Sequence, residues 1–182
     1  MLTELLQRSR LGSVVCLQVA LDLDTLVYLS RMPRLSRLNF TLSITLSSDS
    51  PLVFSNLRHL TLDSQSLEPI SCLLSQTWFP AITDFSAFID NYPSQLELGS
   101  FMACIPMSNT GHPIKNLRFD QLSWPPDKVF RSAALLLHFE DLRPCMALSN
   151  LHYIEIDIEC NMGLTDSQML TLASAWPQLE NL

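Results

Sequence analysis

The chain repeats one spacing of apolar residues, and this repetition constrains its fold more than any other feature. In "FSNLRHLTLDS", Leu57 is followed by Leu60 three residues later and then by Leu62, with polar residues in most of the gaps. Alternation of this kind is typical of a strand with one buried face, because successive side chains point to opposite sides. Seven segments share the spacing, and they begin at Val14, Leu35, Leu57, Ile82, Ile114, Leu151 and Leu179. We therefore expect about six repeats and a truncated seventh.

The first apolar residue of each copy stands one step out of the alternation. We expect it to point inward where the chain turns into the strand. The segments between the copies carry helical patterns. "SLEPISCLLS" offers Ser66 as an N-cap and directs Ile70, Leu73 and Leu74 toward the core.

Two later segments also predict helices. In "LTDSQMLTLASAW", Thr165 and Gln168 have the spacing of a capping box. Its inward positions are Met169, Leu172, Ala173 and Trp176. "PPDKVFRSAALLLHF" predicts a helix capped by Asp127, with Leu136 or Leu137 facing inward.

Strands alternating with helices predict an α/β fold in which the strands form one parallel sheet. We expect a single domain over residues 1–182. The segment 91–113 is the least regular and is interpreted as an insertion, in which "LELGSFMACI" forms a short helix and "PMSNTGHP" an exposed loop. A doubly wound α/β fold is the rival, but the first three spacings, 21, 22 and 25 residues, are shorter than the roughly 30 that a strand–helix–strand unit needs.

Composition narrows the classes of function. The apolar fraction of 47% and charged fraction of 16% are typical of a globular chain, and the net charge of -7 argues against a general nucleic-acid binder. Five cysteines without a two-residue spacing indicate reduced thiols, which favours the cytoplasm or nucleus. The longest strongly apolar run is too short to cross a membrane.

A catalytic constellation is not visible in the sequence. No GxSxG, GxGxxG or P-loop stretch is present. His138, Glu140 and Asp141 lie close together, but a polar end of an amphipathic helix explains them better than a metal or acid–base site. We expect no enzyme activity, no cofactor and no metal.

Several motifs together resemble the leucine-rich-repeat region of fungal F-box proteins. They are "LLQRSR", "MPRLSRL", "FSNLRHLTLDS" and, most specific of all, "LTDSQMLTLASAWPQLENL". The resemblance implies an irregular leucine-rich-repeat solenoid, or horseshoe, with a parallel concave sheet and helical or irregular convex returns. Members of that family join an F-box, which docks on the adaptor of a cullin ubiquitin ligase, to a repeat domain that holds the substrate.

Two features depart from the family pattern. No stretch of this chain reads as an F-box, so an adaptor is a partner only if an F-box lies outside it. The asparagine usual at the ninth repeat position is replaced by Asp22, Ser43, Gln65, Asp90, Leu122 and Glu159. The chain also stops midway through a strand pattern, and we interpret it as a fragment or a truncated gene product.

Stacked strands would place the residues between the apolar positions in three rows on one face. The first repeat would contribute one residue to each row: Cys16, Gln18 and Ala20. The candidate partner-binding residues are Arg37, His59, Asp63, Asp84, Phe88, Arg118, Asp120, Tyr153, Glu155 and Asp157. Because acidic residues gather toward the later repeats beside aromatic ones, we expect this face to bind a basic segment of a protein partner.

The sequence thus predicts a protein–protein interaction module. Its most specific interpretation is the substrate-recognition part of an F-box-type ubiquitin-ligase receptor. The alternative is a scaffold or sensor repeat domain outside ubiquitin transfer. We expect neither nucleic acid nor membrane as a partner.

Overall fold

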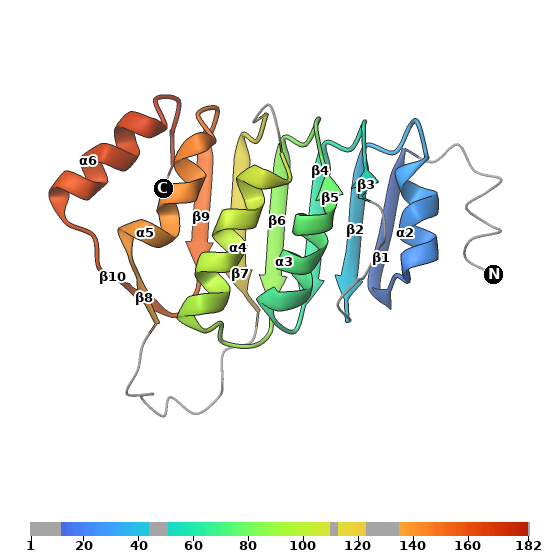
Figure 1. Cartoon of the computed structure of the whole chain (residues 1–182), viewed down its shortest axis with the longest axis horizontal. Helices are drawn as coiled ribbons and strands as arrows, with labels where there is room; N and C mark the ends of the chain where they lie inside the picture. Colours follow the sequence, from blue (N-terminus) through green and yellow to red (C-terminus); the bar gives the residue numbers. More distant parts are fainter. Residues whose placement is uncertain (1–11, 44–50, 110–112, 123–134, 182) are drawn as a thin grey trace.

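The computed structural model describes residues 12–43, 51–109, 113–122 and 135–181. Its centre is a six-stranded parallel sheet in the order β1-β2-β4-β6-β7-β9, so that neighbouring strands follow each other along the chain (Figure 1). The strands are β1 (Ser13–Ala20), β2 (Arg37–Leu42), β4 (His59–Ser64), β6 (Asp84–Ile89), β7 (Asn116–Gln121) and β9 (Tyr153–Asp157). Six of the seven predicted copies therefore share one sheet. The seventh contributes a single bridge, from Asn181 to Tyr153.

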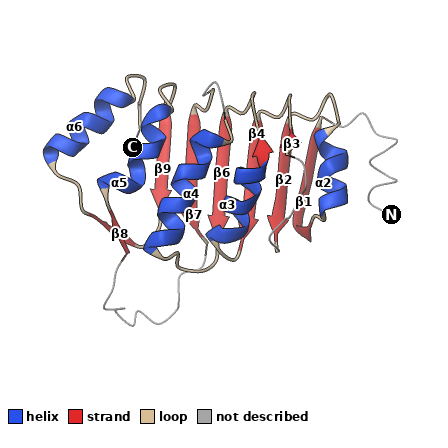
Figure 2. Cartoon of the chain, viewed as in Figure 1, coloured by secondary structure: helices blue, strands red, loops and turns tan. Residues whose placement is uncertain are grey.

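The helices lie on one side of this sheet (Figure 2). They are α2 (Leu23–Ser30), α3 (Leu67–Gln76), α4 (Gln95–Met107), α5 (Phe139–Leu142) and α6 (Asp166–Ala175), with a 3-10 helix η1 (Arg143–Ala147). Two small parallel pairs complete the described elements: β3 (Leu52–Val53) with β5 (Thr77–Trp78), and β8 (Leu135–Leu137) with β10 (Cys160–Met162). A mixed α/β fold with a parallel sheet is confirmed. The doubly wound rival would place helices on both sides.

The apolar pattern of each copy becomes the core. In β4, the side chains of Leu60 and Leu62 are 1% and 0% exposed, whereas Thr61 between them is half-buried. The out-of-step leucine, Leu57, is also fully buried, as predicted. The turn after Leu57 is held by two backbone hydrogen bonds, because the amides of Arg58 and His59 both donate to the Ser36 carbonyl oxygen of the preceding repeat. The same pair of bonds recurs in other repeats and fixes each strand in register with the strand before it.

Helix α3 agrees with the sequence prediction at its core positions. Ile70, Leu73 and Leu74 are buried, and Ser66 stands at the N-cap position. The Ser66 side chain, however, makes no capping hydrogen bond. The packing of the apolar stripe therefore holds this helix without the predicted cap.

The short helix predicted over residues 96–105 is confirmed, and it is the 13-residue helix α4. Ser94 and Glu97 form a capping box at its start, and the ring of Phe101 lies 6.2 Å from that of Phe85 and 5.1 Å from that of Phe119. The buried residues of α4 belong to the core against which the sheet packs. The predicted exposed loop is wrong at Asn109, whose side chain is fully buried, and residues 110–112 lie outside the described part.

The helix predicted over "PPDKVFRSAALLLHF" is wrong where the structure describes it. Residues 123–134, which include the predicted cap Asp127, lie outside the described part, and Leu135–Leu137 form strand β8. Leu137 is buried and Leu136 is 38% exposed. Pairing with β10, more than 20 residues further along the chain, overrides the local helical pattern.

Helix α6 has the predicted capping box, formed by Thr165 and Gln168. Leu172 and Trp176 are buried, as predicted, but Ala173 is exposed. Trp176 donates a 3.0 Å hydrogen bond from its ring nitrogen to the Cys145 carbonyl oxygen in η1. The helix thus contacts the rest of the molecule along a narrower stripe than the sequence indicated.

Among the described helices, none combines the length and the apolar character that a membrane crossing requires.

Candidate functional site

The sheet has a second face, opposite the helices, and we call it the open face. Its side chains form three rows that the strand register defines from β2 to β9. The first row is Arg37, His59, Asp84, Asn116 and Tyr153; the second is Asn39, Thr61, Ser86, Arg118 and Glu155; the third is Thr41, Asp63, Phe88, Asp120 and Asp157. All ten candidate residues therefore lie in these rows, as the sequence predicted.

The first strand departs from the prediction. Ser13 pairs with Arg37, and Cys16 pairs with the inward residue Phe40, because the register of β1 shifts between Cys16 and Ala20. Ala20 pairs with Thr41 and keeps its predicted row. Cys16 is thus wrongly placed in the first row, and the side chain of Gln18 lies outside the described part.

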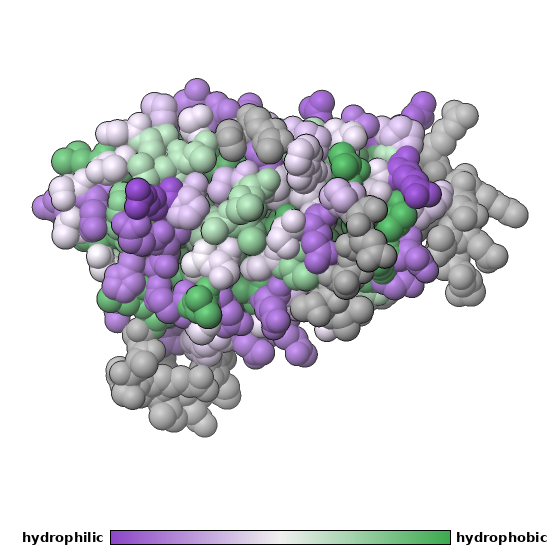
Figure 3. Space-filling view, in the orientation of Figure 1, coloured by the Kyte–Doolittle hydropathy of each residue, from purple (hydrophilic) through white to green (hydrophobic). Residues whose placement is uncertain are grey.

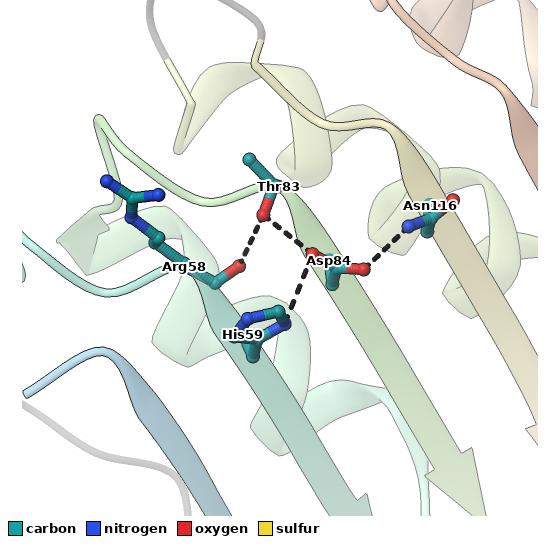
Figure 4. Close-up of polar contacts among 5 residues, drawn as sticks. All are labelled: Arg58, His59, Thr83, Asp84 and Asn116. Atoms are coloured by element: carbon teal, nitrogen blue, oxygen red, sulfur yellow. Dashed lines mark hydrogen bonds and ion pairs between the residues drawn. The ribbon is translucent and has the colours of Figure 1, made fainter. Parts of the chain in front are cut away.

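A polar network crosses the first row around Asp84 (Figure 4). One carboxylate oxygen of Asp84 lies 3.1 Å from the His59 Nδ1 and 2.6 Å from the Thr83 hydroxyl, and the Asn116 amide donates to the other oxygen at 2.6 Å. The Thr83 hydroxyl also lies 3.2 Å from the Arg58 carbonyl oxygen. Asp84 is therefore held by three neighbours and forms an ion pair whenever His59 is protonated.

A second network centres on Arg118 in the later strands. Its guanidinium donates a 2.8 Å hydrogen bond to Asp120 and forms a 3.0 Å ion pair with Glu155, and it lies 5.4 Å from the centre of the Phe88 ring. The hydrogen bond to Asp120 raises the pKa of Arg118. Tyr153 donates a 2.8 Å hydrogen bond to Glu155, and this bond raises the pKa of the Tyr153 hydroxyl.

These contacts change which acidic residues are available to bind a partner. Asp84, Asp120 and Glu155 all have partners within the chain, so they are less available to a basic segment than the sequence suggested. Asp157, at the end of the third row, is exposed, and so is Arg37 at the opposite side of the sheet. The sequence showed which residues share the face but gave no signal for the pairing of Arg118 with Glu155, which joins two strands.

Two cavities open beside these residues. One, of about 440 Å³, has walls from β6, β7 and β9 that include Ser86, Asn116 and Arg118. The other, of about 570 Å³, lies where β2 and β4 end and includes Thr41 and Asp63. Both are within the range of volumes that hold small ligands or long side chains.

The residues considered for chemistry have structural roles. The carboxylate of Asp141 accepts a hydrogen bond from the His138 amide and caps α5, and Glu140 pairs with Arg143 at 3.1 Å. Within the described ranges, no group of three histidine, cysteine or acidic residues is arranged to hold a metal ion. His138, Glu140 and Asp141 thus stand at the start of α5, and not at the end of the helix predicted before it.

The side of the molecule that carries the helices is a weaker candidate for a binding surface than the open face. Hydrophilic and hydrophobic residues are interspersed over it (Figure 3). Its exposed apolar side chains, such as Leu96 in α4 and Leu170 in α6, are scattered over separate helices. The open face, where side chains form continuous rows, is therefore the stronger candidate for binding.

A comparison of the chain with protein-family models found no match, and comparisons with curated proteins and with solved structures found no significant match.

Proposed function

We propose that this chain is a protein-interaction domain with a leucine-rich-repeat-like solenoid arrangement, and that its open face binds a partner protein. The observation that carries the proposal is the strand order. Six parallel strands follow the chain without a reversal, so their outward side chains form rows across the whole sheet.

The curvature expected of such a stack supports the same proposal. Paired strands lie about 4.8 Å apart, whereas packed helices need about 8–10 Å. A stack with strands on one side and helices on the other should therefore bend toward the strands. The open face would then be concave, a shape that lets a partner contact several repeats together.

The composition of the face also fits protein recognition. The Arg118 guanidinium lies over the Phe88 ring, and Tyr153 lies in the outer strand β9 of the sheet. Arginine and aromatic side chains are enriched at protein interfaces and among the residues that dominate binding energy.

A matched pair of substitutions tests the proposal. Ser86 lies in the middle row of the open face, and Ser100 is exposed on α4. Partners would be recovered with wild-type chain from cell extracts and identified by mass spectrometry, and their binding would be measured with purified proteins. We expect Ser86→Arg to abolish binding by obstructing the face and Ser100→Arg to leave it intact. Partners that bind both variants as well as wild type would overturn the proposal.

The more specific form of the proposal is substrate recognition for an F-box-type ubiquitin ligase, acting in the cytoplasm or nucleus. Its support is the resemblance of "LTDSQMLTLASAWPQLENL" and the earlier repeats to fungal F-box proteins. The alternative is a scaffold or sensor repeat domain. The protein would be expressed in its own cells and its partners recovered. If the ligase adaptor is recovered, and Ser86→Arg does not diminish that recovery, the result would favour a ubiquitin-ligase receptor. If partners are recovered without the adaptor, the result would favour a scaffold or sensor domain.

A further inference from the structure

The amino-terminal edge of the sheet carries most of the described cations. Because the six strands are parallel, their amino ends lie together at this edge. Arg37 begins β2, Arg58 and Lys115 directly precede β4 and β7, and Arg31 and Arg34 lie in the turn from α2 to β2. These five exposed residues, out of seven lysines and arginines that the structure describes, are called the basic edge.

The basic edge is not neutralised from within the molecule. Among the residues that the structure describes, none of its five side chains has a hydrogen bond or an ion pair. The other two described cations, Arg118 and Arg143, both form ion pairs. Figure 4 shows the Arg58 guanidinium directed away from Asp84. The charge of this edge is therefore available to a group outside the chain.

Acidic residues near the same edge do not compensate this charge. The carboxylate of Asp84 is already held by three neighbouring side chains. Glu180 is exposed, but its amide donates to the carbonyl oxygen of His152, the residue that precedes β9. Glu180 thus lies beyond β7, on the side of the sheet away from Arg37 and Arg58.

The helices concentrate acidic residues at the opposite edge. Each helix returns against the direction of the strands, so α2, α3 and α4 begin near the carboxyl ends of the strands (Figure 1). Their first turns contain Asp24, Glu68 and Glu97. A carboxylate is stabilised there by the positive end of the helix dipole. No such effect accounts for Arg37, Arg58 and Lys115, which lie in strands and turns.

We propose that the basic edge binds a segment of the partner protein that is rich in aspartate or glutamate. The inference rests on the proposed function and names the chemistry of one part of the partner. Guanidinium groups bind carboxylates with two parallel hydrogen bonds, and complementary charge also speeds association. A basic segment, which the sequence alone suggested, would meet like charge at this edge.

The backbone hydrogen bonds define the spacing of the cations. The Thr83 amide donates to the Arg58 carbonyl oxygen, and the Lys115 amide donates to the Thr83 carbonyl oxygen. Arg58 and Lys115 are therefore two strand spacings apart, about 10 Å. An extended segment advances about 3.3 Å per residue, so carboxylates three residues apart match these two cations.

The charge of the whole chain distinguishes an acidic peptide from a nucleic acid. The net charge of -7 repels a long polyanion, whose phosphates would also approach the acidic side of the molecule. A short acidic segment contacts the basic edge without reaching that side. The edge therefore favours a peptide.

The inference can be tested with peptides that need no knowledge of the partner. Acetylated peptides of glycine and serine, with glutamate or glutamine at every third position, would be titrated into isotope-labelled chain and followed by NMR. We expect the glutamate peptide to give saturable shifts at the amides of Arg37, Arg58 and Lys115, and the glutamine peptide to give none. Arg58→Gln with Lys115→Gln should weaken binding by about tenfold or more.

Arg143→Gln provides the matched control, because this exposed arginine lies in η1 and pairs with Glu140. It should leave the peptide affinity unchanged. Arg37→Gln, at an exposed position, keeps the test valid if the double variant fails to fold. Equal shifts with the glutamine peptide, unaltered binding by the edge variants, or no saturable shift with the glutamate peptide would each overturn the inference. Tighter binding of double-stranded DNA or of phosphatidylserine vesicles at the same amides would also overturn it.

The two proposals can fail separately. A partner that is lost with Ser86→Arg but binds Arg58→Gln/Lys115→Gln as tightly as wild type would remove the basic edge from the interface and leave the proposed function standing. Peptide binding without any partner on the open face would do the reverse.

Discussion

Leu60 and Thr61 are neighbours in β4, yet their side chains lie on opposite sides of the sheet. Leu60 is 1% exposed in the core, whereas Thr61 is half-buried in the middle row of the open face. We expect Leu60→Ala to lower the free energy of unfolding by about 2–5 kcal/mol, because it leaves a cavity between repeats. Thr61→Ala should lower the free energy of unfolding far less. Chemical denaturation measures both, and equal losses would mean that the two faces are wrongly assigned.

The apolar pattern of the repeats places Ile156 on the inward side of β9, at the position equivalent to Leu62, but Ile156 is less deeply buried than the core leucines of β4. It is half-buried and packs at the margin of the core. Its strand, β9, has β7 on one side but only the single bridge to Asn181 on the other. The pattern of apolar residues identified its inward direction, while its depth depends on which neighbour covers it.

Asp63 should make stability depend on pH. Burial and the neighbouring Asp90 raise the pKa of Asp63 in the folded chain, so the folded form holds this proton more tightly than the unfolded form. The resulting stabilisation is fully present below the ordinary pKa of an aspartate and is lost as pH rises through the raised pKa of the folded state. Asp63→Asn should remove this loss, so the variant should gain stability relative to wild type between mildly acidic and neutral pH. Thermal unfolding across that range measures it, and a constant difference between the two proteins would contradict the assignment.

At the scale of elements, two helices that begin with serine differ in how they are capped. Ser94 accepts a hydrogen bond from the Glu97 amide at the start of α4, whereas Ser66 makes no capping bond at the start of α3. We expect Ser94→Ala to lower the free energy of unfolding by about 0.5–2 kcal/mol. Ser66→Ala, the matched control, should have little effect. A larger loss with Ser66→Ala would contradict the capping geometry.

The elements that the sequence predicted best are those with a strong local pattern. The alternation around Leu60 and the spacing of Ile70, Leu73 and Leu74 each identify a buried face within a few residues. Strand β8 was missed because its partner β10 is remote in the sequence. Helix α4 was predicted over residues 96–105 and is three residues longer, while the packing of Phe101 beside Phe85 and Phe119 of the sheet depends on strands that the local pattern does not specify.

The whole molecule should unfold from the edges of its sheet. Strands β4, β6 and β7 are paired along both sides, whereas β1 pairs with β2 alone among the described strands. Hydrogen exchange measured by NMR should therefore be slowest in β4, β6 and β7 and faster in β1 and β9. Slow exchange in β1 equal to that in β6 would show that another part of the molecule protects this edge, contrary to the strand order.

The charge of the open face also belongs to the scale of the whole molecule. The sequence predicted a broad acidic surface. In the tertiary structure, several of its carboxylates are paired with other side chains of the chain. Arg118 compensates Asp120 and Glu155, and Asn116 and His59 hold Asp84.

The sequence by itself determined which side chains are inward and which are outward, because strand alternation and helical periodicity are properties of neighbouring residues. It also determined the chain-ordered sheet, since the same pattern recurs and each copy can bury its apolar row only against the next. Only the tertiary structure decided the shifted register of Cys16, the pairing of β8 with β10 and the ionic partners of Arg118. These depend on distances between residues far apart in the sequence, and periodicity carries no information about such distances.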